Sequence, residues 1–275
     1  MTLLRRIPFP LSPTRLEANL TNLRQRLAQA ASSAGRSPSE VELVAVTKDA
    51  SLEATAELAR LGQHDLGENR AQDLEQKGRA LAAQGLEVCW HFVGHLQANK
   101  VKRVLQHARV LHSIDSAELL LRVDRIAGEL GLQPTVYLQI ALTGEPEKHG
   151  LTPGEIPEVV RAARSLEHLR LCGLMVMGPR EDPALATTRR LFEQAAQLAT
   201  ALEGDPECAR VFSDRRCRLS MGMSGDFELA IAAGSHLVRV GSALFASGRG
   251  VTAGDAAPAA RASATTGARE RQELR

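Results

Sequence analysis

Aromatic residues are scarce in this sequence: they make up 3% of 275 residues, with one tryptophan and one tyrosine. So few rings leave little material for the base-stacking surfaces of proteins that bind single-stranded nucleic acid. Charge of one sign is not in excess either, because 34 Lys and Arg residues balance 32 Asp and Glu residues, for a net charge of +2. We therefore expect no nucleic-acid partner and no general attraction to a membrane surface.

Cysteines and long apolar runs are also few. Cys89, Cys172, Cys208 and Cys217 form neither a CxxC pair nor the spacing of a zinc site. No apolar run approaches the roughly 20 residues of a membrane-spanning helix, and residues 1–10 lack the apolar core of a signal peptide. These features predict a reduced, cytoplasmic protein without a membrane partner.

The sequence does contain a regular alternation of short apolar segments and amphipathic ones. After an irregular leader over residues 1–13, leucines at helical spacing predict a helix over 14–34, which Gly35 ends. Strands are expected near residues 41–48, 64–69, 88–94, 109–114, 135–140, 169–177, 218–221 and 236–240. Helices are expected between them, near residues 51–61, 70–84, 95–107, 116–130, 153–165, 183–202 and 225–233.

Strands that alternate with helices predict a parallel α/β sheet, because parallel neighbours need a crossover. Eight such units in about 250 residues are typical of a closed (β/α)8 barrel of the TIM type. An open doubly wound sheet is the alternative, but its GxGxxG turn is missing. We expect one barrel domain over residues 14–246 and a disordered tail over 247–275, where large apolar residues are almost absent.

Lys48 ends the first predicted strand. Along a strand it shares a face with Val44 and Val46. Burying an ammonium on such an apolar face costs free energy unless the group has a partner or a chemical role. A partly dry lysine loses proton affinity, and its free amine can form a Schiff base. The alternative is that Lys48 turns out to solvent where the strand ends.

The ends of strands seven and eight resemble a phosphate site. Residues 221–224 open a predicted helix, so N–H groups and the Ser224 hydroxyl are available there. Gly241 and Ser242 follow strand eight and offer further donors, and barrels frequently bind phosphate after these two strands. A capped helix and a tight turn would explain the same residues without a ligand.

A Schiff-base lysine facing a phosphate site suggests pyridoxal 5′-phosphate (PLP). Arg239 shares a strand face with Leu237 and Gly241 and so is expected to point inward. A guanidinium donates hydrogen bonds and accepts none, so placed at the pyridine nitrogen it would keep that nitrogen unprotonated and suppress carbanion chemistry. A solvent-exposed or carboxylate-paired arginine is the alternative.

Several segments carry a family resemblance. The most specific are residues 90–100, WHFVGHLQANK, and residues 219–224, LSMGMS; residues 45–48, 67–73, 113–116, 148–151, 173–175 and 238–245 agree with them. In these the chain resembles the pyridoxal phosphate homeostasis proteins, which are alanine racemase N-terminal-domain-like.

The resemblance covers about residues 41–245 and implies a fold-type III PLP barrel without the second β domain of alanine racemase. It implies that Lys48 holds PLP as a Schiff base, that Arg239 contacts the ring nitrogen, and that no residue has a catalytic role. The remaining residues implied to bind the cofactor are Asn69, Met175, Ser220, Met221, Gly222, Met223, Ser224, Gly241 and Ser242. Ala141 departs from the asparagine usual in the family, and serine at 242 replaces a frequent threonine.

Two further groups of residues need an interpretation. His91 and His95 are four residues apart, but they straddle a strand-to-helix turn, so hydrogen bonds that fix the turn are favoured over a metal pair. Lys100, Lys102 and Arg103 form a basic cluster, which is usually a solvated helix face; a site for an anion or a partner is the alternative.

The resemblance to racemases raises the question of turnover. Those enzymes need two bases, of which the second is usually a tyrosine from another domain, whereas Tyr137 lies in the middle of a predicted strand and is expected to pack in the core. We therefore expect a monomeric PLP reservoir or carrier, with apo PLP-dependent enzymes as partners that receive the cofactor. A racemase or eliminase of low activity, and a cofactor-free Schiff-base aldolase, are the alternatives.

Overall fold

The computed structural model describes residues 12–142, 149–179, 182 and 184–246. Eight parallel strands close into a barrel in the order β1 to β8, as predicted. They are β1 (Glu42–Val46), β2 (Asp65–Glu68), β3 (Cys89–Phe92), β4 (Val110–Ile114), β5 (Thr135–Gln139), β6 (Arg170–Met175), β7 (Arg218–Ser220) and β8 (Leu237–Val240).

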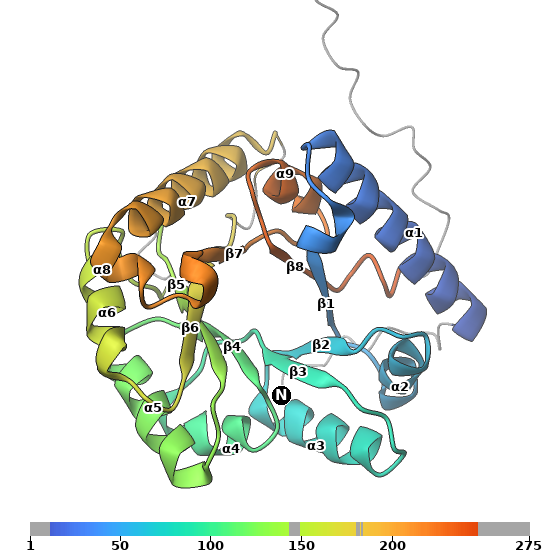
Figure 1. Cartoon of the computed structure of the whole chain (residues 1–275). Coiled ribbons are helices and arrows are strands. Elements are labelled where there is room, and N and C mark those ends of the chain that lie inside the picture. Colours follow the sequence, from blue (N-terminus) through green and yellow to red (C-terminus); the bar gives the residue numbers. More distant parts are fainter. Residues whose placement is uncertain (1–11, 143–148, 180–181, 183, 247–275) are drawn as a thin grey trace, which may run out of the picture.

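The helices form a ring outside these strands (Figure 1). They are α1 (Pro13–Ser33), α2 (Leu52–Arg60), α3 (Ala71–Ala82), α4 (Val101–Leu105), α5 (Ala117–Leu130), α6 (Ile156–Ala162), α7 (Ala186–Gly204), α8 (Pro206–Ala209) and α9 (Phe227–Ala232). Short 3-10 turns occur at η1 (Pro38–Glu40), η2 (Ala98–Lys100), η3 (Ala163–Ser165) and η4 (Ser213–Arg215).

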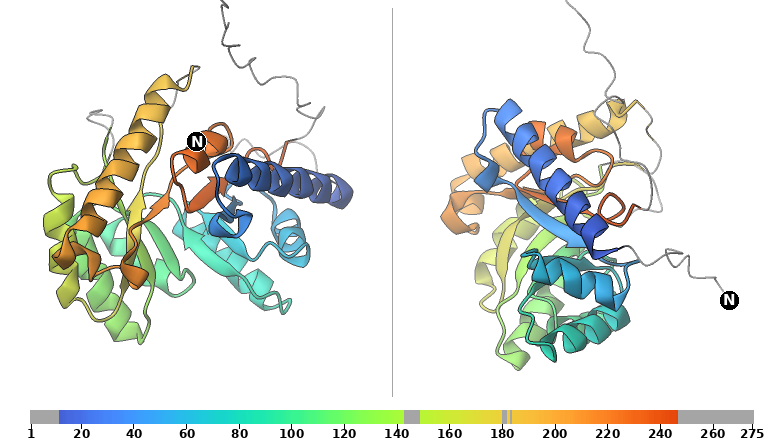
Figure 2. Two further views of the ribbon diagram at one scale, coloured as in Figure 1. Left: turned by 45° about the horizontal axis from the view of Figure 1, so that its top comes forward. Right: turned by 90° about the vertical axis from the view of Figure 1, so that its right-hand side faces the viewer.

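Helix α1 explains how the last strand can lack a helix of its own. It lies between α9 and α2 in the ring (Figures 1 and 2), beside the paired strands β8 and β1. Ser12 caps it by accepting a hydrogen bond from the N–H of Arg15, and its buried face carries leucines three or four residues apart. The helix that precedes β1 therefore takes the place of one that would follow β8.

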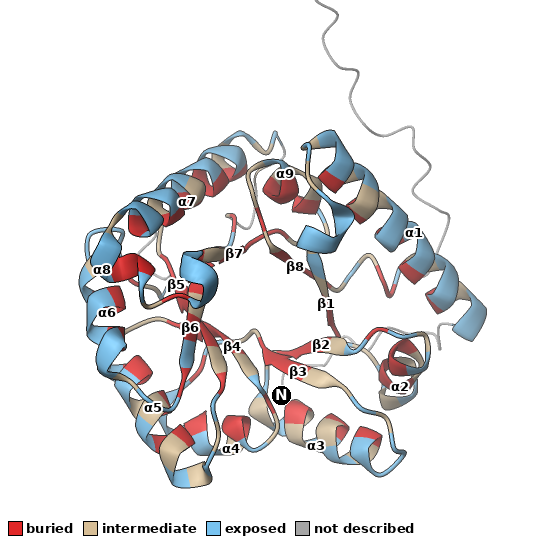
Figure 3. Ribbon diagram, viewed as in Figure 1, coloured by how far each residue is buried: buried red, intermediate tan, exposed pale blue. Residues whose placement is uncertain are grey.

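Two apolar clusters fill the structure unequally. The large one lies between the strands and the helices, where the inner faces of the helices are buried (Figure 3). Inside the barrel the apolar cluster is small and consists of Val44, Val46 and Leu237, with Val93 packed against it. The usual barrel interior is filled by layers of branched aliphatic side chains, so this interior leaves unusual room for polar groups.

Some predicted boundaries were wrong. In place of a continuous helix over 95–107, an extended segment at Gln97 leads into η2 and then into α4, which has five residues. The segment Pro206–Ala209 forms α8, capped by Asp205, where no helix was predicted. Pro13, placed in the leader, begins α1. The rest of that leader up to residue 11, and the predicted tail over 247–275, lie outside the described residues.

The described part of the chain contains no helix with both the length and the apolar content needed to span a bilayer.

Gly173 generates a prediction about barrel closure. A Cβ atom at this position would lie 1.8 Å from the carbonyl oxygen of Arg218, its partner on β7. We expect Gly173→Ala to lower the free energy of unfolding by about 3 kcal/mol, because β6 and β7 would have to separate. Urea denaturation measures the loss. Gly154→Ala is the control, since nothing lies within 4 Å of the added Cβ; equal effects of the two substitutions would contradict the prediction.

Candidate functional site

Lys48 lies at the end of β1 but outside the barrel interior. The strand ends at Val46, and a turn closed by the Ala50 N–H and the Thr47 carbonyl (2.8 Å) follows. The Lys48 side chain is exposed. The expectation of a partly dry amine was therefore wrong, because the alternation that would align Lys48 with Val44 and Val46 stops with the strand.

A buried ion pair fixes the backbone immediately before Lys48. The ammonium of Lys77, on α3, lies 2.6 Å from Oε1 of Glu68 and donates to the Thr47 carbonyl at 2.7 Å. The Thr47 hydroxyl donates to the same carboxylate oxygen at 2.7 Å. The other oxygen of Glu68 is buried without a partner among the described residues. This network ties the ends of β1 and β2 to α3 and so orients the turn that carries Lys48.

Arg239 points into the barrel, as the alternation along β8 predicted. Its Nη1 donates to the Ser220 carbonyl and hydroxyl, both at 2.7 Å, and its Nη2 donates to the Val176 carbonyl at 3.1 Å. Burial lowers the pKa of Arg239 to about 10, partly offset by Asp226, so the side chain remains a cation at neutral pH. No carboxylate among the described residues forms an ion pair with it, and two of its five N–H donors have no acceptor there.

Ser224 connects the loops after β7 and β8. Its hydroxyl accepts hydrogen bonds from the N–H groups of Gly241 (3.3 Å) and Ala243 (3.4 Å). A Cβ at Gly241 would lie 3.0 Å from the Val46 carbonyl oxygen, so glycine favours the close approach of this loop to β1. Two backbone donors and a hydroxyl therefore gather beside the end of β1.

The remaining predicted site residues divide between the interior, the outer core and the mouth. Met175 is buried at the end of β6, and Asn69 is half-buried just after β2. Ser242 is exposed and Met223 is half-buried. Met221 packs in the outer core and not toward the mouth.

The turn before α9 also differs in detail from its prediction. Gly222 has a φ of +99°, and a Cβ there would meet that of Ala230 at 2.7 Å, so this turn requires glycine. Asp226 accepts from the Met223 N–H, and α9 begins only at Phe227. Ser224 therefore belongs to a turn and not to the helix.

The structure separates the two histidines that the sequence places four residues apart. His91 is buried inside the barrel, where its ring contacts His112 and Asp65. His95 is at the mouth, 3.3 Å from Asp115 and stacked on His149 at 4.3 Å between ring centroids. They share no partner in the part of the chain that the structure describes, so they do not form the metal pair that their spacing allows.

Among the described residues, two clusters carry metal-ligand residue types, Asp65 with Cys89 and His91, and His95 with Asp115 and His149. In the first, burial and the nearby Asp65 raise the pKa of Cys89 to about 11. Without a bound metal ion the residue is therefore a thiol at neutral pH.

Sequence reasoning missed a set of polar contacts inside the barrel. His112 is completely buried, with Nε2 2.9 Å from Nδ1 of His91 and Nδ1 2.9 Å from the Ser220 hydroxyl. Tyr137 stacks on its ring at 4.8 Å and 4°. The available signal was a histidine in the middle of an apolar strand.

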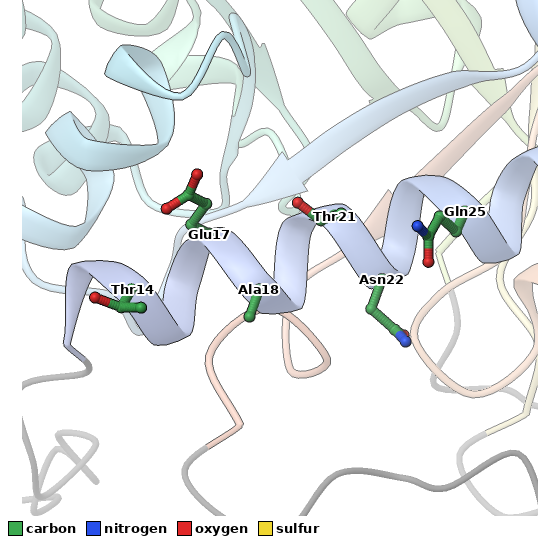
Figure 4. A pocket seen from close by; sticks show the side chains of 6 residues that line it. All are labelled: Thr14, Glu17, Ala18, Thr21, Asn22 and Gln25. Carbon is green, nitrogen blue, oxygen red and sulfur yellow. The ribbon is translucent and has the colours of Figure 1, made fainter.

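A surface groove lies on the outer side of α1 (Figure 4). It is lined by the exposed residues Thr14, Glu17, Ala18, Thr21, Asn22 and Gln25. These short, mostly polar side chains come from one helix and include none of the strand-end residues, so the groove is separate from the candidate site. In the basic cluster Lys102 is exposed, Lys100 and Arg103 are half-buried, and Arg103 pairs with Glu75 at 2.6 Å.

Comparison with known proteins gives consistent matches. The family model for the alanine racemase N-terminal domain matches residues 18–248. A protein of Deinococcus radiodurans named pyridoxal phosphate homeostasis protein is 40% identical over 230 residues, which are 83% of this chain and 98% of the relative. One of the same name from Escherichia coli K12 is 38% identical over 231 residues, covering 82% and 94%.

Solved structures agree with these matches. PipY of Synechococcus elongatus PCC7942, in a structure with PLP bound, has a TM-score of 0.72 and 34% identity, covering 84% of this chain and all of PipY. An alanine racemase of Clostridium difficile has a TM-score of 0.62 at 17% identity, covering 84% of this chain and 56% of the racemase, which shows a shared fold.

The ion pair behind Lys48 generates a prediction. We expect Lys77→Met to cost about 3–5 kcal/mol of unfolding free energy, because it leaves the Glu68 carboxylate buried without a cation. Adding Glu68→Leu should recover most of that loss, since an apolar pair of similar volume needs no neutralisation. Chemical denaturation measures both. Lys102→Met, the same change at an exposed lysine, is the control; a double variant no more stable than Lys77→Met would contradict this account.

Proposed function

This chain belongs to the alanine racemase N-terminal domain family, among the pyridoxal phosphate homeostasis proteins, and from this premise we propose that it binds PLP as a reservoir or carrier. PLP supplies an aldehyde that can condense with a primary amine. Lys48 provides the amine: a C=N bond forms between its Nζ and the aldehyde carbon, and water leaves. The cofactor is held in this way as a Schiff base without substrate turnover.

The observation that carries the proposal is the pairing of β1 with β8. Val44 lies opposite Arg239 and Ala45 opposite Val240, so the strand that leads to Lys48 runs beside the one that carries the buried cation and the Gly241 loop. An amine, a donor-only guanidinium and a cluster of N–H groups thus come from adjacent strands. This is a combination suited to an aldehyde, a ring nitrogen and a phosphate.

Each group fits one part of the cofactor. The hydroxyls of Ser224 and Ser242 would hold the phosphate, at the loops where barrels frequently bind it. The N–H groups of Gly241 and Ala243, which donate to the Ser224 hydroxyl, would turn to the phosphate when it binds. Gly222 and Met223 shape the turn beside them, and Met221 supports it from the outer core.

The ring would meet Arg239 through the N–H donors that have no acceptor among the described residues. The Ser220 hydroxyl already contacts Arg239 and His112. We therefore assign Ser220 to support of the guanidinium and not to the phosphate. Met175 and Asn69 would line the pocket at the ends of β6 and β2.

The absence of turnover is supported by the chemistry of Tyr137. It is the one tyrosine of the sequence, and it is buried against His112 in the barrel interior. Burial and the nearby Cys172 raise its pKa well above the usual value, so it cannot supply the second base of a racemase. We further propose that the protein acts as a cytoplasmic monomer and passes PLP to apo-enzymes.

Covalent trapping tests the cofactor and the lysine together. We expect purified protein incubated with PLP and borohydride to carry a pyridoxyl group on Lys48, because the hydride reduces the C=N bond to a stable secondary amine. Peptide mapping distinguishes Lys48 from the other four lysines of the sequence. Lys48→Ala should remove the label and Lys102→Ala should keep it. A label at another lysine, or none, would refute the proposal.

Proton exchange tests for turnover. We expect α-proton exchange of amino acids in D2O, with PLP bound, to be no faster for the wild type than for Lys48→Ala, because no described tyrosine can act as the second base. NMR of added alanine and serine measures the rate. Exchange by the wild type at enzyme-like rates, lost in Lys48→Ala, would identify a racemase or eliminase instead.

A further inference from the structure

Five side chains from five strands form a continuous hydrogen-bonded chain through the barrel. It runs from Asp65 to His91 (3.1 Å), His112 (2.9 Å), Ser220 (2.9 Å) and Arg239 (2.7 Å). Asp65 is the first residue of β2 and is 46% exposed, whereas the other four are buried. The chain therefore connects solvent at the N-terminal end of the barrel with the cation that faces the mouth.

The two ends of the chain determine the direction of its hydrogen bonds. Arg239 can only donate, and an ionised carboxylate can only accept. The hydrogen bond from His91 lowers the pKa of Asp65, so Asp65 is ionised at neutral pH. Burial lowers the pKa of His112 well below its usual range, and the charge of Arg239 acts in the same direction, so this ring is neutral.

Two neutral rings can be placed between the Asp65 carboxylate and Arg239 in only one arrangement that satisfies every group. Nε2–H of His91 donates to Asp65, which leaves Nδ1 of His91 to accept from Nε2–H of His112. Nδ1 of His112 then accepts from the Ser220 hydroxyl, whose lone pair accepts from Arg239. All four protons point away from Arg239, and each bond polarises the next in the same sense.

We propose that Asp65, His91 and His112 are positioning residues for Arg239 and act on it through Ser220. Each link presents its negative end toward the guanidinium, so the chain extends the influence of the Asp65 carboxylate to a cation that lacks a carboxylate partner among the described residues. It also directs the hydroxyl proton of Ser220 toward Nδ1 of His112, so that the hydroxyl oxygen can accept a hydrogen bond from Arg239. The consequence for the cofactor rests on the proposed contact of Arg239 with the PLP ring nitrogen.

The flanking residues favour a fixed arrangement. Tyr137 stacks on His112 with its ring plane within 4°, which restricts rotation of the imidazole. The ring of His91 lies 5.2 Å from the ring of His112 between centroids, with 27° between the two planes. Buried rings held in this way keep one pair of nitrogen partners, and a side-chain network that is fully satisfied specifies a single arrangement.

Nitrogen NMR of protein without PLP tests the direction of the chain. We expect the ¹⁵N spectra at pH 7 to show His91 and His112 as neutral rings that carry the proton on Nε2. Asp65→Asn should shift the imidazole resonances of His112, although His112 does not contact residue 65. A cationic ring or an Nδ1–H tautomer for either histidine would overturn the inference.

PLP binding tests the effect on Arg239. Asp65 lies at the far end of the barrel from Lys48, and Asp65→Asn keeps the shape of its side chain. We expect this substitution to change the absorption maximum of bound PLP. It should also weaken PLP binding about fivefold, which corresponds to the free energy of one hydrogen bond. Glu42→Gln is the matched control. Glu42 is the first residue of β1 and pairs with Arg218 at 3.2 Å, so its substitution removes the same charge at the same end but outside the chain.

The outcomes separate this inference from the proposed function. A spectral change and weaker binding in Asp65→Asn, but not in Glu42→Gln, support the positioning role, since a purely structural residue would leave the spectrum of bound PLP unchanged. Identical behaviour of the two variants overturns the positioning role while PLP binding itself stands. Wild-type protein that takes up no PLP contradicts the proposed function. The histidine tautomers seen by NMR would then still show whether the hydrogen-bonded series of side chains exists.

Discussion

A guanidinium buried inside a closed barrel is the constraint on which the interior depends. Moving such an ion out of water costs several kcal/mol even after relaxation. Here the cost is offset by the carbonyls of Ser220 and Val176 and by the Ser220 hydroxyl. These acceptors lie at the ends of β6 and β7, which precede β8 in the sheet, so the curvature of the barrel wall brings them to Arg239. Closure of the barrel then brings β8 beside β1 and its lysine.

The cation can be tolerated because the stability of the fold comes from elsewhere. Most buried apolar side chains lie between the strands and the helices, while the apolar cluster inside the barrel consists of three residues. Hydrophobic burial in the outer layer therefore stabilises the barrel largely without the interior. The interior is left free for side chains whose partners are polar.

The sequence predicted the architecture well because strands buried on both faces and amphipathic helices leave strong local patterns. It was weaker where structure depends on a few residues, as in the break at Gln97 and the four-residue helix α8. Alternation along β8 correctly placed Arg239 inside. Alternation wrongly placed Lys48 inside, because β1 ends at Val46. The sequence of a single strand does not reveal where its pairing with the neighbouring strands stops.

The polar chain was beyond sequence reasoning for a related reason. His91, His112 and Ser220 lie in three short strands, and their contacts depend on the register of β3 with β4 and on distances across the barrel. The signal was present only as polar residues at inward-facing positions. Without the stagger of the strands, nothing in the sequence says that three such residues meet.

Residues 220–224 show why residue types alone assign roles poorly at strand ends. Ser220, the last residue of β7, points inward to Arg239, whereas Met221 packs outward in the core. Gly222 then turns the backbone with a positive φ, and Ser224 reaches the N–H groups of the β8 loop. The two serines are four residues apart and chemically identical, but strand alternation governs one and the turn governs the other. Ser220 is therefore available to the interior cation and Ser224 to an anion at the mouth.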